Sequence, residues 1–339
     1  MKSFDETHDR PLDKTRARQL RNPGLWLALA IVAAFTLWPV LSSNRAYARE
    51  TAFTILKAVA LASSLNILLG YTGYVSFGHI VFFGLGGYVG FYMMENHNAH
   101  LAIAVLAGAL SAALLAFLLG RAILRLRGAY FALATIGVNE AVRAFIKNFD
   151  PLGGPIGMTL NFGVYRAYGG PDRALWIAYI ATGVLTLTVV LVSFLVKSSR
   201  FGLGLMAIRE NEDAAEVMGI VAPSAKTWAF VLSAVFPGMM GVLFFFKNGN
   251  IEPGDAFVLH QSIETIVMVM LGGQGTVLGP LVGAAAYQRL RGLLLVSALF
   301  KNIQLAVAGV LLLIIILFVP AGVVGWLRGR FPRLRRVLE

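Results

Sequence analysis

Long apolar runs follow one another along most of this 339-residue chain, and they limit its fold more than any other feature. A helix needs about 17–25 apolar residues to cross a lipid bilayer, because its backbone polar groups find partners only within the helix there. The sequence therefore predicts an all-α fold, a polytopic transmembrane helical bundle of about ten membrane segments, some of them broken or re-entrant. The predicted segments are 25–41, 51–70, 77–94, 101–120, 128–146, 174–196, 228–246, 262–272, 278–297 and 302–320.

The composition excludes a water-soluble fold and several kinds of chemistry. Charged residues make up 14% of the chain and the mean hydropathy is +0.73, whereas about a quarter of the residues in soluble domains are charged. The chain has no cysteine and five scattered histidines, so we expect no disulfide, metal site or cofactor. The net charge of +12 does not predict a nucleic-acid partner, because the cations adjoin apolar runs as topology signals do.

The positions of these cations predict the topology. Six cations occupy a basic N-terminal tail (1–24), which shows no cleavage pattern of a signal peptide, and five arginines occupy a basic C-terminal tail (321–339). The positive-inside rule predicts that both tails lie in the cytoplasm, on either side of a membrane domain (25–320). Connections 121–127 and 197–227 are also cation-rich and predicted to be cytoplasmic. The connections predicted to face outside are 95–100, 147–173 and 247–261.

Two glycine-rich stretches match each other at a spacing of 202 residues. The first, Leu69–Gly73, reads LGYTG, and the second, Leu271–Gly275, reads LGGQG. Glycine lets a backbone leave helical geometry, and paired interruptions of this kind in two halves of a membrane protein indicate a translocation path. We call these stretches the first and second breaks. The glycines predicted to hold unwound backbone beside the path are Gly70, Gly73, Gly272 and Gly275.

Close helix packing is the alternative role for glycine in membrane helices. It stays open for the four glycines of the breaks, and we favour it for Gly84, Gly86, Gly87, Gly90 and Gly283.

Polar residues next to the breaks add candidates for the path, because each would be costly against lipid. These residues are Asn66, Ser76, His79, Gln274 and Thr276. Elsewhere in the spans, Glu140 and Arg143 share a helix face and are interpreted as a structural ion pair rather than a proton relay. Lys57 lies near the outer end of its span, where a lysine can extend its ammonium group to the interface, and we assign it no function.

Connection 197–227 contains the longest charged stretch inside the chain. It is predicted to form one amphipathic helix from Leu205 to Met218, with Ile208 and Ala215 on the same face and with Gly219 as its end. Such a helix outside the bilayer is either a docking surface for a partner or a solvated connection.

A family resemblance enters at this helix. Asp213, Ala214 and Ala215, followed after three residues by Gly219, resemble the E-A-A-x-x-x-G coupling signature of ABC importer permeases, with aspartate in place of glutamate. Together with 66–90, 132–157, 199–220 and 263–285, this region resembles the LivM-type permeases of branched-chain amino acid and urea ABC importers. The resemblance implies that ATPase coupling involves Arg209, Glu210, Asp213, Ala214, Ala215, Glu216 and Gly219.

The same resemblance implies a permease subunit of the bacterial inner membrane that works by alternating access. Its partners would be a second, homologous permease, two cytoplasmic ATPase subunits and an extracytoplasmic solute-binding protein. The chain itself contains no phosphate-binding loop and no catalytic constellation, so we expect a transport subunit and not an enzyme.

The identity of the substrate stays open at this point. Branched-chain amino acids are the first expectation of the family, and urea, short amides and aromatic acids are alternatives. A secondary transporter driven by an ion gradient is the main rival class, and it predicts transport without an ATPase. A membrane enzyme is a weaker rival, because the spans hold few titratable groups at one depth.

Overall fold

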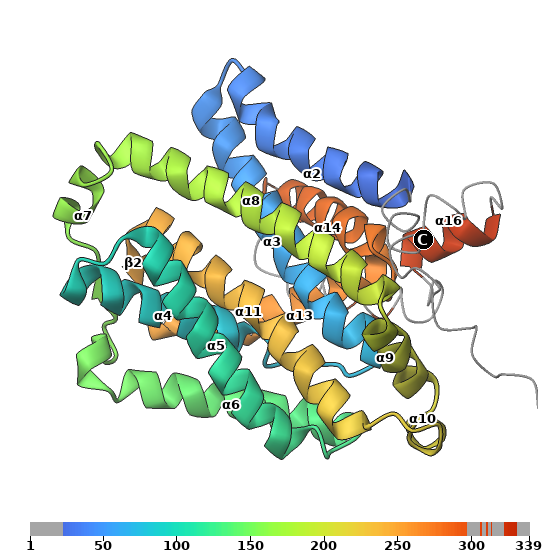
Figure 1. The fold of residues 1–339 in the computed structure, drawn as a ribbon. Helices are drawn as coiled ribbons and strands as arrows, with labels where there is room; N and C mark the ends of the chain where they lie inside the picture. Colours follow the sequence, from blue (N-terminus) through green and yellow to red (C-terminus); the bar gives the residue numbers. More distant parts are fainter. Residues whose placement is uncertain (1–22, 297–305, 307–309, 311–312, 314–321, 331–339) are drawn as a thin grey trace, which may run out of the picture.

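The structure is a computed structural model that describes residues 23–296, the single residues 306, 310 and 313, and residues 322–330. Helices dominate it, as the sequence predicts, and the two strands that it contains are two residues long (Figure 1). The predicted segment 302–320, apart from the three single residues, and most of both tails lie outside the described residues.

The long helices come in chain order with short elements between them. The long helices are α2 (Pro23–Leu41), α3 (Arg45–Thr72), α4 (Ile80–His97), α5 (Leu101–Ile123), α6 (Ala129–Lys147), α8 (Pro171–Ser198), α11 (Ala222–Asn248), α13 (Leu259–Gly272) and α14 (Leu278–Val296). The shorter elements are η1 (Asp150–Leu152), β1 (Met158–Thr159), α7 (Phe162–Arg166), α9 (Arg200–Glu210), α10 (Glu212–Val217), β2 (Asn250–Ile251), α12 (Pro253–Ala256) and α16 (Gly322–Arg330).

Seven stretches of the described residues are long and apolar enough to cross a membrane: α2, α3, α5, α6, α8, α11 and the unit Pro253–Gly272, which joins α12 to α13. The predicted number of ten segments is therefore not confirmed. Helix α4 is present where a segment was predicted, but it is not among the seven, because glycines and the polar end Glu95–His97 lower its hydropathy.

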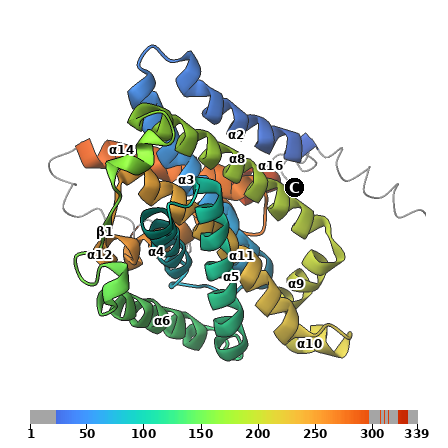
Figure 2. The ribbon, with the colours of Figure 1, turned by 60° about the vertical axis from the view of Figure 1, so that its left-hand side comes forward.

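The connections gather at two opposite ends of the bundle (Figures 1 and 2). At one end β1 pairs with β2 in antiparallel register, Met158 opposite Ile251, and the backbone N–H of Asn161 donates to Glu95. At the other end Arg127, between α5 and α6, contacts Asp213 of α10. The cation-rich connections 121–127 and 197–227 thus lie together at one end, and the connections 95–100, 147–173 and 247–261 lie at the other.

Helix α11 lies in the centre and packs against α3, α4, α5 and α8. Glycines allow the close approach of α4: a β-carbon added at Gly86 would lie 2.5 Å from the α-carbon of Gly238, and one added at Gly90 would lie 2.6 Å from a methyl group of Val242. Added β-carbons at Gly84, Gly87 and Gly283 would also overlap neighbouring atoms. These contacts support the packing role of the five glycines.

Candidate translocation path and coupling region

The two breaks lie directly against each other, although about 200 residues separate them. Asn66, in the last two turns of α3, is fully buried and uses both ends of its amide. Its Nδ2 donates to the carbonyl oxygen of Thr276 at 3.0 Å, and its Oδ1 accepts from the backbone N–H of Gly275 at 2.9 Å. One side chain of α3 therefore satisfies a backbone group of the second break and one of the residue directly after it, and neither residue belongs to a helix.

The matched glycines of the breaks have matched conformations. Gly73 ends α3 with a φ of 77°, and Gly275, at the same place in the repeat, has a φ of 76°. Both angles are in the left-handed region, where a residue with a β-carbon is strained. The sequence prediction of unwound backbone is met at these two positions.

The prediction is wrong for Gly70 and Gly272, which are still helical. Gly70 lies in the last turn of α3, and Gly272 is the last residue of α13. A β-carbon at Gly70 would lie 2.6 Å from the backbone nitrogen of Gly275, and one at Gly272 would overlap the carbonyl oxygen of Gly279. These two positions require glycine because it has no side chain, and not because it can adopt a positive φ.

The remaining path candidates are only partly brought together. Thr276 caps α14, since its hydroxyl donates to the carbonyl oxygen of Gly273 at 2.8 Å and accepts from the N–H of Gly279 at 2.9 Å. Gln274 is half-buried beside it. His79 instead contacts α11, with its Nε2 3.0 Å from the carbonyl oxygen of Ser233. Ser76 is buried, and its hydroxyl has no partner among the described residues.

Arg209 of α9 touches both breaks. Its Nη1 donates to the carbonyl oxygen of Gly70 at 2.7 Å, and a β-carbon added at Gly275 would lie 2.8 Å from the same nitrogen. One added at Gly73 would lie 3.3 Å from its Cγ. The last carbonyl groups of a helix lack intrahelical partners and carry partial negative charge, so a guanidinium is a favourable donor there.

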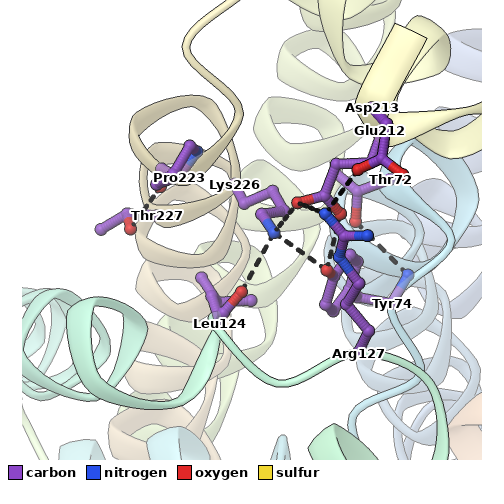
Figure 3. A network of polar contacts seen from close by, with 9 residues as sticks. All are labelled: Thr72, Tyr74, Leu124, Arg127, Glu212, Asp213, Pro223, Lys226 and Thr227. Carbon is purple, nitrogen blue, oxygen red and sulfur yellow. Dashed lines mark hydrogen bonds and ion pairs between the residues drawn. The ribbon is translucent and has the colours of Figure 1, made fainter. Parts of the chain in front are cut away.

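A second connection joins the first break to α10 (Figure 3). Glu212 accepts hydrogen bonds from Lys226 Nζ at 2.6 Å and from the Tyr74 hydroxyl at 3.0 Å. Lys226 also donates to the Tyr74 hydroxyl at 2.9 Å and to the carbonyl oxygen of Leu124 at 3.0 Å. Arg127 approaches Glu212 at 3.5 Å. This cluster ties α10 to the residue after Gly73, to α11 and to the connection after α5.

The charge state of Glu212 follows from these contacts. Burial raises the pKa of its carboxyl, but the hydrogen bonds from Lys226 and Tyr74, with the charges of Lys226 and Arg127, outweigh this effect. The pKa of Glu212 therefore lies below its ordinary value.

Sequence reasoning missed this cluster. Tyr74, Glu212 and Lys226 are far apart in the chain, and no spacing relates them. One signal was present, because Lys226 stands near the start of a long apolar helix, where an ionised group needs a partner.

The coupling region, residues 197–227, differs from the prediction in one respect. The predicted single helix 205–218 is two helices, α9 and α10, separated at Asn211. Asn211 has extended geometry, and its side chain accepts from the N–H of Ala214 at 3.0 Å. Asparagine is a preferred N-cap because its oxygen satisfies a free backbone donor, so it starts a new helix here.

The predicted buried face is confirmed in part. Leu205, Ile208 and Ala215 are buried in one apolar cluster, but Met218 is 83% exposed. Ala215 therefore packs within its own chain, and its role in ATPase coupling stays a prediction. Gly219 has a φ of 89°, as expected for the end of a helix.

The exposed surface of α10 is formed by other residues. Glu210, Asp213, Ala214, Glu216 and Gly219 are exposed. Val217, Met218 and Val221 add a solvent-facing apolar group to this surface, with exposed fractions of 89%, 83% and 68%. We call Val217, Met218 and Val221 the apolar tip.

Apolar spans, two facing breaks between helices and a polar helical region at one end are the features of a multi-pass membrane transport protein. The family model of the permease component of branched-chain amino acid transport systems matches residues 47–319. The chain therefore belongs to this family of ABC permeases, which confirms the resemblance found in the sequence.

Individual relatives agree with the family model. The chain is 28% identical to the high-affinity branched-chain amino acid transport system permease protein LivM of Salmonella typhimurium and 26% identical to that of Escherichia coli, each over 91% of this chain and 76% of the relative. It is 23% identical to a probable LivM of Methanocaldococcus jannaschii, over 77% of this chain and 88% of the relative. No solved structure matches significantly.

Proposed function

We propose that this chain is the membrane-spanning subunit of an ABC importer that carries branched-chain amino acids into the cell. The family and the names of the relatives support the substrate class. Two cytoplasmic ATPase subunits, a second homologous permease and an extracytoplasmic solute-binding protein complete the importer in this proposal. The end that holds α9 and α10 faces the cytoplasm, as do both termini, which agrees with the cations of 121–127 and 197–227.

The observation that carries the mechanism is the position of Arg209. It lies on the coupling region and contacts Gly70 of the first break and the backbone around Gly275 of the second. A displacement of α9 therefore moves the groups that hold the two breaks together. Closure of the ATPases on nucleotide displaces α10 and α9, and the breaks separate or close in response, which gives alternating access.

Transport by purified protein tests the function directly. The chain is co-purified with its partner subunits and placed in proteoliposomes with the binding protein, and uptake of labelled leucine is followed. Uptake should require ATP and should survive ionophores that abolish ion gradients. Uptake that proceeds without ATP and stops with the ionophores would instead establish the rival class, a secondary transporter.

A further inference from the structure

A polar pocket opens between α3, α13 and α14, on the same helices that carry the breaks. Its cavity has a volume of about 120 Å³, which is enough for several water molecules. Apolar surface comes from Ala58, Leu61 and Met268. The polar residues that line the pocket are Thr54, Lys57, His260, Gln261, Glu264, Thr265, Gln288 and Arg291.

The pocket lies within the apolar spans. Lys57 is inside the span formed by α3, and Glu264 is inside the span Pro253–Gly272. Along α3, 13 residues separate Lys57 from Gly70, which corresponds to about 20 Å of helix. Ionisable groups at such a depth are costly and mark a site for a ligand or an ion more often than a structural feature.

The charges of the pocket are incompletely paired. Arg291 Nη1 forms an ion pair with Glu264 Oε2 at 3.0 Å, and the buried Arg291 Nε has no hydrogen-bond partner in the described part of the chain. Lys57 forms no ion pair with any described residue. Its ammonium group lies 4.2 Å from the centre of the Phe244 ring, which compensates only part of the lost hydration. The pocket holds one cation more than it holds carboxylates.

We propose that this pocket is a substrate subsite that binds the charged head of an α-amino acid, an inference that rests on the proposed transport function. The substrate carboxylate lies at Lys57, and the substrate ammonium group lies at Glu264. Gln261 and Gln288 supply further hydrogen bonds, and an aliphatic side chain contacts Leu61 and Met268. The interpretation of Lys57 as a cation without function, drawn from the sequence, is thereby replaced.

The position of the pocket along α3 is consistent with a substrate that binds there before it reaches the breaks. Lys57 stands between the end of α3 that holds Glu50, the ion-pair partner of Lys247, and the opposite end that holds Gly70. A solute that enters from the outer end of α3 reaches the pocket first and the breaks afterwards.

Equilibrium binding of labelled leucine to the purified importer, without ATP or binding protein, tests the subsite. Lys57→Met keeps the length of the side chain and removes its charge, and it should weaken binding at least about tenfold, because a charged hydrogen bond is lost. Glu264→Gln should also weaken binding. Lys247→Met is the matched control: Lys247 lies in the last turn of α11 and pairs with Glu50 outside this pocket, and binding should be unchanged.

Competition by substrate analogues separates recognition from a structural role. 4-Methylpentanoate lacks the ammonium group and 3-methylbutylamine lacks the carboxylate, so each should compete with leucine at least about tenfold less well in the wild type. In Lys57→Met, the discrimination against the amine should largely disappear. A structural role of Lys57 would lower the yield of protein without changing this discrimination, and should Lys57→Met fail to accumulate, Lys57→Gln serves for the same measurement.

The outcomes distinguish this inference from the transport function. The subsite would be overturned if Lys57→Met bound leucine as the wild type does, or if both analogues competed as well as leucine in the wild type. It would also be overturned if a wild-type importer that transports leucine did not bind it in this assay. Failure of the wild type to take up leucine with ATP would instead overturn the proposed function.

Discussion

Arg209 Nη1 and the carbonyl oxygen of Gly70 are 2.7 Å apart, although 139 residues separate them in the chain. This bond connects α9, in the coupling region, to the last turn of α3, where the first break begins. Because the second break packs against Gly70 as well, a single guanidinium lies where three segments meet. The contact gives a physical route from the coupling region to the breaks.

Arg209→Ala should abolish this route. Loss of a charged hydrogen bond at a helix end should reduce ATP-dependent uptake at least about tenfold, while the importer still assembles. Arg209→Lys keeps the charge but loses the planar set of donors, so we expect an intermediate rate. Arg200→Ala, at the exposed start of the same helix, is the control and should transport normally. Normal uptake by Arg209→Ala would show that the contact carries no coupling.

Gly275→Ala should reduce both stability and transport. Its φ of 76° costs about 1–2 kcal/mol for a residue with a β-carbon, and the added carbon would lie 3.0 Å from the carbonyl oxygen of Gly70. Gly73→Leu and Gly275→Leu should abolish uptake while the protein still inserts. Gly137→Ala has a helical position with open space around it and is the matched control. Uptake assays with quantification of membrane protein measure both effects.

Asn66→Ala should lower the thermal stability of the purified protein. It leaves the N–H of Gly275 and the carbonyl oxygen of Thr276 without their partner, at a cost of about 1–3 kcal/mol. Asn66→Asp should not restore stability, because a carboxylate cannot donate to the carbonyl oxygen of Thr276. Asn96→Ala, at an exposed position of α4, should leave the unfolding temperature unchanged. An equal effect of both alanine variants would contradict the bridging role of Asn66.

The stability of the protein should depend on pH through Glu212. The pKa of this carboxyl is lowered in the folded protein, so its contribution is present above the unfolded value of about 4.3 and is lost as the pH falls through the lower folded value. The difference in unfolding temperature between wild type and Glu212→Gln should therefore be largest near neutral pH and shrink below about pH 4. Glu210→Gln, at an exposed position of α9, is the control and should leave the unfolding temperature at neutral pH unchanged. A difference that stays constant with pH would exclude this linkage.

Helices and breaks could be predicted from the sequence because hydropathy and glycine act locally. The repeat LGYTG and LGGQG predicted unwound backbone at four glycines, and the structure has it at Gly73 and Gly275 but not at Gly70 and Gly272. The separation of α9 from α10 was also within reach, since Asn211 is a strong N-cap residue.

Three features were not predictable in this way: the hydrogen bonds of Asn66 to Gly275 and Thr276, the hydrogen bond of Arg209 to Gly70, and the pocket that contains Lys57. Each depends on which distant helices pack together, and a single sequence holds no local signal for that. Hydropathy predicted only the position of Lys57 along its apolar span. The role proposed for Lys57 depends on Glu264 and Arg291, which lie on other helices.

The apolar tip of the coupling region should dock on an ATPase subunit. Val217, the last residue of α10, and Met218 directly after it are the most exposed apolar side chains of the coupling region, and Glu216 beside them is exposed as well. This surface therefore gains most from burial against a partner. Met218→Glu should weaken co-purification with the ATPases and remove the stimulation of ATP hydrolysis by substrate, while insertion is spared. Gly219→Val should act in the same direction through its φ of 89°.

Ala215 lies on the other side of α10, where it is buried with Leu205 and Ile208. Ala215→Trp should therefore disturb the packing of α9 and α10 and lower the yield of folded protein, which Met218→Glu should not do. Ile156→Glu changes an equally exposed apolar side chain at the opposite end of the bundle, and its assembly should be normal. Full assembly and full stimulation in Met218→Glu would show that the ATPases bind elsewhere on the cytoplasmic end.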